Sequence, residues 1–443
     1  MAHHRLCGRI YDGTTPALVV GDPKLIKSIM TGSNALKSFH DRRSVKTNHP
    51  VMSKFLSSLE GSDWLRVRNI AVKAFNSESK LRLLESHVNV ASEQVMEVLA
   101  SSSDNKQHVD LKQLWGTYTM DVIASVAFAV QKPSAEFVTH ASSLFTFPFW
   151  RKFLDYTAPK WLLEPLGFTV LPQPAMDFFQ DITEKLIHER RAAASADVEP
   201  DFLQMMLDVE SSDEQLSAKD RKLTHEEIVG QSVLFFSVGY ETSSQVLMYT
   251  SYLLGEYPEC QEKLYEELKS LENRDGELNH DNLKHARYLR AVIEESMRLY
   301  NPVLRMERKA SCDFPLGDTG IIIEKGTIVV IPVWAIHHDP DVYPDPETFD
   351  PERFMDDKRR AEIRAGSIYL PFGQGKRDCI GKDFAIMEIR AVLGEAVLNY
   401  QFLPSLQTPK PLQFVPNGRP LLGPQGMYAR VVKREGERCR VPV

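Results

Sequence analysis

The sequence lacks any long apolar run. Over its 443 residues, no segment approaches the about 20 consecutive apolar residues that a membrane-spanning helix requires. The opening, MAHHRLCGRIYDGTT, has neither the apolar core nor the cleavage pattern of a secretory signal. As printed, the chain is therefore expected neither to span a membrane nor to enter the secretory route.

Cysteine is also scarce. The chain has five, an odd number, and they are widely scattered: Cys7, Cys260, Cys312, Cys379 and Cys439. This spacing spells out neither a disulfide framework nor a zinc site of the CxxC type. We expect a reducing compartment.

Basic residues are not in excess. The 53 Lys and Arg are outnumbered by 60 Asp and Glu, which gives a net charge of -7, and no basic run dominates. Binding to a phosphate backbone requires clustered cations, so we expect no nucleic-acid partner. The remaining composition, 43% hydrophobic and 26% charged, is that of a globular protein with a large core.

Helical spacing dominates the patterns that are present. Apolar residues recur three and four apart over 63–100 and again over 110–129. A long central helix is predicted from Thr224, its N-cap, with Glu227 completing a capping box, to Tyr257. Strand patterns are confined to ALVV near the N-terminus, the stretch 320–339 and a short C-terminal strand, so the fold class predicted is mainly α with a minor β portion.

The segment 145–174 is rich in aromatic residues and proline, which predicts an irregular connector. Its apolar side chains could cover the core or form a peripheral membrane contact, and the sequence leaves both interpretations open.

Cys379 lies in the loop FGQGKRDCIG, directly before a predicted helix. A nucleophile, a redox sensor, a metal ligand and a packed thiol are the alternatives. No signature of a Cys-His enzyme accompanies it. The helix N-terminus, Lys376 and Arg377 would stabilise a permanent thiolate, and the loop glycines would let a flat macrocycle approach, so a ligand to a soft iron centre is favoured.

The stretch FGQGKRDCIGKDFAIME resembles the haem-binding signature of the cytochrome P-450 family, F-x-x-G-x-R-x-C-x-G-x-x-x-A. The matching residues are Phe372, Gly375, Arg377, Cys379, Gly381 and Ala385. The resemblance implies that Cys379 is the axial ligand of the iron in haem b and that Phe372 contacts the haem. It also implies that residues 1–443 form one catalytic domain.

Three further motifs match the same family. Glu295 and Arg298, alone a typical surface ion pair, would with Arg353 form the family's structural brace for the cysteine loop. Trp64, Arg68, Arg308 and Arg377 would contact the haem propionates, for which the guanidinium fork is suited. Any one of these arginines alone would more often be surface charge.

The third motif is Val238-Gly239-Tyr240-Glu241-Thr242, which resembles the oxygen-activation motif A/G-G-x-D/E-T. Gly239 would contact the haem, while Glu241 and Thr242 would be the catalytic acid-alcohol pair. The alternative for an isolated case is a threonine that bonds back to its own helix. Val238 departs from the usual Ala or Gly and would add bulk beside the haem.

The resemblance covers nearly the whole chain and is closest to the animal branch that contains steroid-hydroxylating and drug-hydroxylating enzymes and thromboxane synthase. It implies a haem-thiolate monooxygenase that inserts one atom of O2 into an apolar steroid, fatty acid or xenobiotic. Alternatives are a peroxide isomerase like thromboxane synthase, which tends to lack the alcohol that Thr242 supplies, and an inactive haem-binding form.

The family's substrate pocket would map onto Phe235, Ser237, the loop 303–306 and the connector from Phe145. No flavin or nicotinamide motif is present, so the implied electron donor is NADPH-cytochrome P-450 reductase, with cytochrome b5 as a second partner. A basic docking surface is expected from Lys376, Arg377, Lys382, Lys73, Lys80 and Arg82, although scattered surface cations are common.

The resemblance also implies the cytosolic face of the endoplasmic reticulum. The family's N-terminal anchor and first helix are missing from the printed chain, which is expected to be either a soluble variant, and then cytosolic, or an incomplete sequence.

Overall fold

The computed structural model describes most of the chain. The described residues are 7–12, 15–43, 49–75, 78–128, 130, 132–144, 154, 158, 160–163, 171–192, 201–208, 222–273, 278–415 and 423–434. Helices make up most of them and strands a small part, which confirms the predicted fold class.

The helices and strands follow one another in the chain without a repeating order. The α-helices are α1 (Pro23–Met30), α2 (Ala35–Ser38), α3 (Pro50–Ser53), α4 (Gly61–Phe75), α5 (Glu78–Leu83), α6 (Glu85–Asp104), α7 (Leu111–Phe128), α8 (Ala135–Ser143), α10 (Lys160–Leu163), α11 (Gln173–Ala192), α12 (Phe202–Asp208), α13 (His225–Glu256), α14 (Pro258–Ser270), α15 (His280–Leu283), α16 (Arg287–Leu299), α17 (Val333–His337), α18 (Asp357–Ala365) and α19 (Lys382–Asn399). Two 3-10 turns are η2 (Pro351–Phe354) and η3 (Gly375–Arg377). The strands are β1 (Cys7–Asp12), β2 (Thr15–Val20), β3 (His108–Asp110), β4 (Met306–Lys309), β5 (Phe314–Pro315), β6 (Ile322–Ile323), β7 (Ile328–Ile331), β8 (Tyr400–Pro404) and β9 (Tyr428–Lys433).

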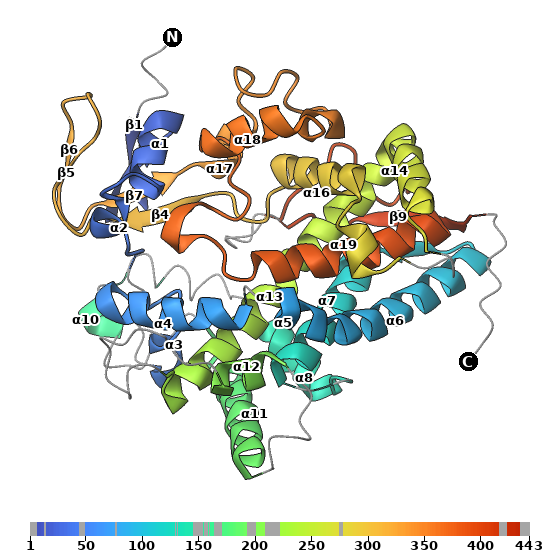
Figure 1. Cartoon of the computed structure of the whole chain (residues 1–443), viewed down its shortest axis with the longest axis horizontal. Helices are drawn as coiled ribbons and strands as arrows, with labels where there is room; N and C mark the ends of the chain where they lie inside the picture. The colour runs from blue at the N-terminus through green and yellow to red at the C-terminus, as the bar shows by residue number, and fades with distance from the viewer. Residues whose placement is uncertain are drawn as a thin grey trace.

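The strands form small sheets at the edge of a helical body. A four-stranded sheet has the order β1-β2-β7-β4, in which β2 and β7 are parallel and the other pairs antiparallel. A three-stranded sheet, β3-β9-β8, and the pair β5-β6 complete them. Figure 1 shows the four-stranded sheet with α1 and α2 at one end of the molecule. The long helices α6, α13 and α19 lie away from that end, among the other helices.

Helix α13 forms the centre of the molecule. Its predicted start is confirmed, because the Thr224 side chain accepts the amide of Glu227 at 3.2 Å and Glu227 accepts the amide of Thr224 at 2.9 Å. At about 1.5 Å per residue it spans about 50 Å. It packs against α7, α11, α16 and α19, and most of its side chains are buried, as expected for a helix that is apolar on all sides.

One large apolar cluster joins the helices, and a smaller one lies between the four-stranded sheet and α1. In the ranges given above, no helix is long and apolar enough to cross a membrane. Most of the connector 145–174 lies outside the described residues, so its predicted membrane contact stays a prediction.

Candidate active site

The cysteine loop, residues 372–381, is a closed turn. The amide of Cys379 donates to the carbonyl of Phe372 at 2.8 Å. The amide of Asp378 donates to the carbonyl of Gly375 at 3.1 Å. Gly375 has a φ of +76°, and a Cβ there would lie 2.0 Å from the Met30 carbonyl at the end of α1. Only glycine permits this backbone conformation and this close approach together.

The Cys379 side chain is exposed, and its thiol is perturbed by the groups around it. It is exposed to a water-sized probe, yet burial is the largest influence on its thiol and raises the pKa, while a backbone hydrogen bond from Gly381 and the charge of Arg68 lower it. A metal bound there would reverse the shift, because a coordinating thiol loses its proton.

Four arginines converge beside this loop: Arg42, Arg68, Arg308 and Arg377. Burial and then the charge of Arg42 lower the pKa of Arg308 to about 9, and burial with the charges of Arg42 and Arg308 lowers that of Arg377 to about 9. Three carboxylates oppose them. Asp378 lies 2.6 Å from Arg68, Asp41 lies 3.9 Å from Arg377, and the charge of Glu307 acts on Arg42. The cluster therefore carries excess positive charge and suits a dianionic group.

Arg377 and Trp64 are brought together as the sequence predicts. The guanidinium of Arg377 lies 4.0 Å from the centroid of the Trp64 ring and donates to the carbonyls of His40, Leu56 and Leu59. Arg377 is thus held in place by backbone acceptors. It is only 5% exposed, so the expectation that it contributes to a surface docking patch is wrong.

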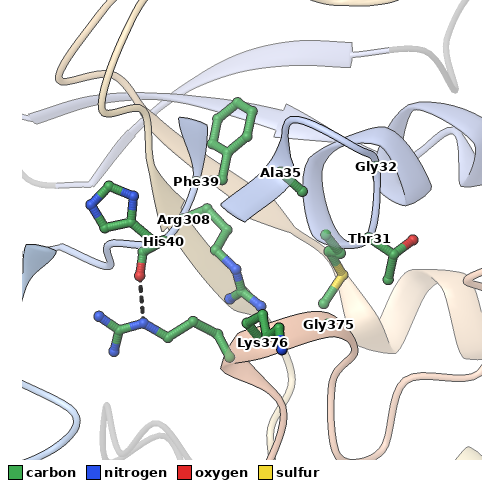
Figure 2. Close-up of a pocket in the computed structure, with 10 residues that line it drawn as sticks. Thr31, Gly32, Ala35, Phe39, His40, Arg308, Gly375 and Lys376 are labelled. Carbon is green, nitrogen blue, oxygen red and sulfur yellow. Dashed lines mark hydrogen bonds between the residues drawn. The ribbon is translucent and has the colours of Figure 1, made fainter. Parts of the chain in front are cut away.

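A cavity of about 280 Å³ adjoins the arginine cluster, between the end of α1, α2, β4 and η3. Figure 2 shows Arg308 extending from β4 toward the turn at Gly375 and Lys376, with the bond from Arg377 to the His40 carbonyl beside it. Arg308 is 2% exposed, so its charge is directed into the interior.

Sequence reasoning missed Arg42. Its guanidinium donates to the carbonyl of Arg377 at 3.2 Å, and the charge of Cys379 is among the influences on its pKa. The available signal was the pair Arg42-Arg43 with no acidic residue at helical spacing to neutralise it. Arg43 pairs with Glu307 at 3.0 Å, and the charge of Glu307 also acts on Arg42.

The middle of α13 also faces open space. Val238 is 47% exposed although the helix is buried on both sides of it, and Gly239 and Thr242 are partly exposed. The Thr242 hydroxyl donates to the carbonyl of Val238 at 2.8 Å, and the Glu241 carboxylate accepts from the Gln245 amide at 3.2 Å. Each member of the predicted acid-alcohol pair therefore has its partner within its own helix.

Gly239 faces α7. A Cβ at this position would lie 2.9 Å from the Ile123 side chain, so the glycine lets the two helices pack closely. Its predicted contact with haem stays a prediction. Phe235, one of the predicted pocket residues, is 6% exposed, and the Ser237 hydroxyl donates to the Leu234 carbonyl.

The predicted brace residues contact one another. Glu295 and Arg298, both fully buried, are joined by two hydrogen bonds of 2.7 and 2.8 Å, and Arg353 lies 3.3 Å from Glu295. Arg298 also donates to the carbonyl of His337, whose ring accepts the amide of Leu370 at 2.9 Å. Burial and the charge of Arg298 lower the pKa of His337 to about 3, so its ring stays a neutral acceptor.

These features fit the haem that the resemblance implies. The thiol is exposed, the arginines beside it outnumber the carboxylates that oppose them, and α13 presents an exposed valine, Val238. In the part of the chain that the structure describes, no group of three His, Cys, Asp or Glu could hold a metal ion. A metal at Cys379 would take its other ligands from a macrocycle.

The expected docking surface is only partly basic. Arg82 pairs with Asp281 at 2.7 Å, and Lys80 donates to the carbonyl of Lys73. Lys376 is exposed and Lys382 is partly exposed. The surface charge near the loop therefore comes from lysines more than from arginines.

Comparison with known proteins gives matches over nearly the whole chain. A family model described as Cytochrome P450 matches residues 5–427, a range that includes every site residue named above. Similar proteins include cytochrome P450 3A56 from Fundulus heteroclitus, 34% identical over 427 residues that cover 94% of this chain and 83% of that one. Cytochrome P450 3A9 from Rattus norvegicus is 32% identical over 445 residues, or 98% and 86% of the two chains.

Proposed function

The chain belongs to the cytochrome P450 family and is a haem-dependent monooxygenase, and from its site we propose that Cys379 is the axial ligand of the haem iron. The observation that carries this proposal is the accessible thiol in a closed loop beside four arginines. When bound, thiolate-ligated haem supplies the electron-rich iron that favours cleavage of the O–O bond. The protein supplies position, charge and protons.

Arg42, Arg68 and Arg308 would neutralise the two haem propionates. Their charges repel one another, and Arg308 is buried, so two carboxylates inserted among them would relieve an existing cost. Arg377, with its three backbone acceptors and the Trp64 ring, would hold the loop in line with the cluster.

Thr242 and Glu241 would manage protons on the opposite side. The Thr242 proton is donated to the Val238 carbonyl, so the hydroxyl oxygen is left to accept a hydrogen bond from water in the open space. Glu241, whose carboxylate accepts a hydrogen bond from Gln245 at 3.2 Å, would take up protons from solvent and pass them to that water once it leaves Gln245. Thr242→Ala should uncouple electron consumption from product formation while haem stays bound, and unchanged coupling would remove Thr242 from this role.

A second candidate is a peroxide isomerase, which needs neither electrons nor delivered protons. The bond from Thr242 to its own helix favours it, because that hydroxyl proton is already committed. Product formed from O2 and NADPH with a reductase supports the oxygen-inserting reaction, whereas turnover of an organic peroxide alone supports the isomerase.

The substrate would be sizeable and largely apolar, such as a steroid, fatty acid or xenobiotic. Val238 presents an apolar side chain to the open space, and the loop 303–306 is partly exposed. Electrons would come from NADPH-cytochrome P-450 reductase, with cytochrome b5 as a second partner, docking near Lys376 and Lys382 on the cytosolic face of the endoplasmic reticulum. A reduction rate that is independent of ionic strength would contradict electrostatic docking.

The central proposal is tested with carbon monoxide. Reduced wild-type protein should show the strongly red-shifted Soret band of thiolate-ligated haem. Cys379→Ser should bind haem without that band, while Cys260→Ser, a substitution of a half-buried cysteine outside the site, should keep it. Absence of the band from folded, haem-loaded wild-type protein would overturn the assignment of Cys379.

A further inference from the structure

Glu294 and Glu295 are adjacent on α16 but bind different partners. Glu294 is 4% exposed, and its carboxylate accepts from Arg360 at 2.8 and 2.9 Å and from Arg364 at 2.6 Å. Both arginines belong to α18. Charge-assisted bonds of this geometry are among the strongest in proteins, so Glu294 fastens α18 to α16.

The end of α18 is fastened in turn to the cysteine loop. The carbonyl of Arg364 accepts the side-chain amide of Gln374, and the hydroxyl of Ser367 donates to the carbonyl oxygen of the same amide at 2.7 Å. Ser367 is fully buried and has a φ of +56°, which directs the chain back after the helix. Gln374 lies inside the turn that the bond from Cys379 to Phe372 closes.

We propose that Glu294, Arg364 and Gln374 form a second clamp on the cysteine loop, and that this clamp fixes the position of the Cys379 sulfur. Arg364 is its central member, because its side chain binds Glu294 while its carbonyl binds Gln374. The inference rests on the proposed role of Cys379 as the haem ligand. Glu294 is a positioning residue, since it acts only through α18.

The second clamp reaches the loop at a different point from the brace of Glu295, although Tyr369 contacts both. Its ring stacks on His337 and lies 5.8 Å from the Arg364 guanidinium, and its hydroxyl donates to the Glu294 carbonyl. That brace reaches the loop through His337 and Leu370, before Phe372, whereas the Glu294 clamp reaches it through Gln374, after Phe372. Attachment on both sides restricts rotation at Gly373, which has a φ of +73° and joins the two points. If only one of the two attachments remained, the loop could rotate about the backbone of Gly373.

Stability alone does not account for a carboxylate at position 294. Burying an ion pair is costly, and well-packed apolar residues of similar size are often at least as stabilising. A buried network with fixed hydrogen-bond directions instead selects one geometry. The clamp transmits that geometry from Glu294 to Gln374 within eleven residues of α18 and its following turn, 364–374.

The test compares Glu294→Gln and Gln374→Met with a matched control, Asp357→Asn. Asp357 also joins α18 to α16, through Arg287 and Arg290, but its side chain is 62% exposed and it does not reach the loop. The rate of hydrogen exchange of the Cys379 amide is measured without haem. With haem bound, the rate at which the carbon monoxide complex loses its red-shifted band is measured. In both clamp variants the two rates should be about tenfold higher than in wild type, and in the control they should equal those of wild type.

The double variant decides whether the two residues act as one unit. Because removal of either member opens the same clamp, Glu294→Gln with Gln374→Met should be no faster than the single variants. Full additivity, or an effect of Glu294→Gln without one from Gln374→Met, would overturn the clamp. A lowered unfolding midpoint with unchanged exchange and conversion would also overturn it. If the wild-type protein lacks the thiolate band, the proposed ligand fails, and the exchange measurements still decide the clamp.

Discussion

The charged side chains of the brace bind partners from several elements, whereas Thr242 and Glu241 in the middle of α13 bind within their own helix. Glu295 on α16 binds Arg298, Arg353 and the amide of Asp350. On α13, Thr242 binds Val238 and Glu241 binds Gln245. Networks between elements fix one geometry, while bonds within a helix can be exchanged for water at little cost. We therefore expect the region around the proposed metal ligand to be held in one geometry and the proposed oxygen and substrate side to rearrange more readily.

The largest effect is expected when the brace is broken. Glu295→Gln leaves Arg298 buried with no full counter-charge, which should cost about 3–5 kcal/mol. Chemical unfolding and haem content measure the loss. Glu352→Gln, which removes an exposed ion pair with Lys263, is the control and should cost less than about 1 kcal/mol. Equal losses from the two variants would show that the brace is no more than surface charge.

Glu388 lies where the two regions meet, on α19 with its carboxyl near Ser243 of α13, and burial raises its pKa to about 8. For an acid whose folded pKa is raised, stability is highest below the unfolded pKa and is lost as pH rises toward 8. Glu388→Gln should therefore be more stable than wild type above pH 8, and its free energy of unfolding should depend less on pH between about pH 5 and 8. A variant that is destabilised at pH 8 would contradict this.

Arg308→Met should have opposite effects with and without haem. Burial and Arg42 lower the pKa of Arg308 to about 9, so the unfolded chain binds more protons above that pH and haem-free stability should rise as pH increases beyond about 9. Replacing Arg308 should stabilise the haem-free protein by about 1 kcal/mol and weaken haem binding about tenfold. Titration of haem into both proteins, with unfolding curves at two pH values, measures both. If the haem-free variant is instead less stable than wild type, the four arginines do not carry the excess positive charge that we propose.

The smallest effect on stability is expected at Val238. Because its side chain is 47% exposed, Val238→Ala should change the free energy of unfolding by less than about 0.5 kcal/mol. Spectral titration should nevertheless show tighter binding of bulkier apolar ligands. Val246→Ala, which truncates a buried valine two turns further along the same helix, is the matched control and should cost about 1–3 kcal/mol without that gain.

Several features could be predicted because their cause is local. The capping box at Thr224 and Glu227, the glycine loop around Cys379 and the spacing of Glu295 and Arg298 depend on residues within one or two turns. The predicted docking role of Arg377 was wrong because its burial is decided by carbonyls more than 300 positions earlier in the chain. Arg42 was missed for the same reason.

The sequence by itself determined that one cysteine, in a loop of glycines before a helix, is suited to a permanent thiolate, and that the chain folds mainly into helices. Only the tertiary structure decided which charges act together. It divided the neighbours Glu294 and Glu295 between two networks, turned Gly239 toward α7, and gathered four arginines from separate elements. Helical spacing specifies the face on which a side chain lies, but long-range packing decides what that face meets.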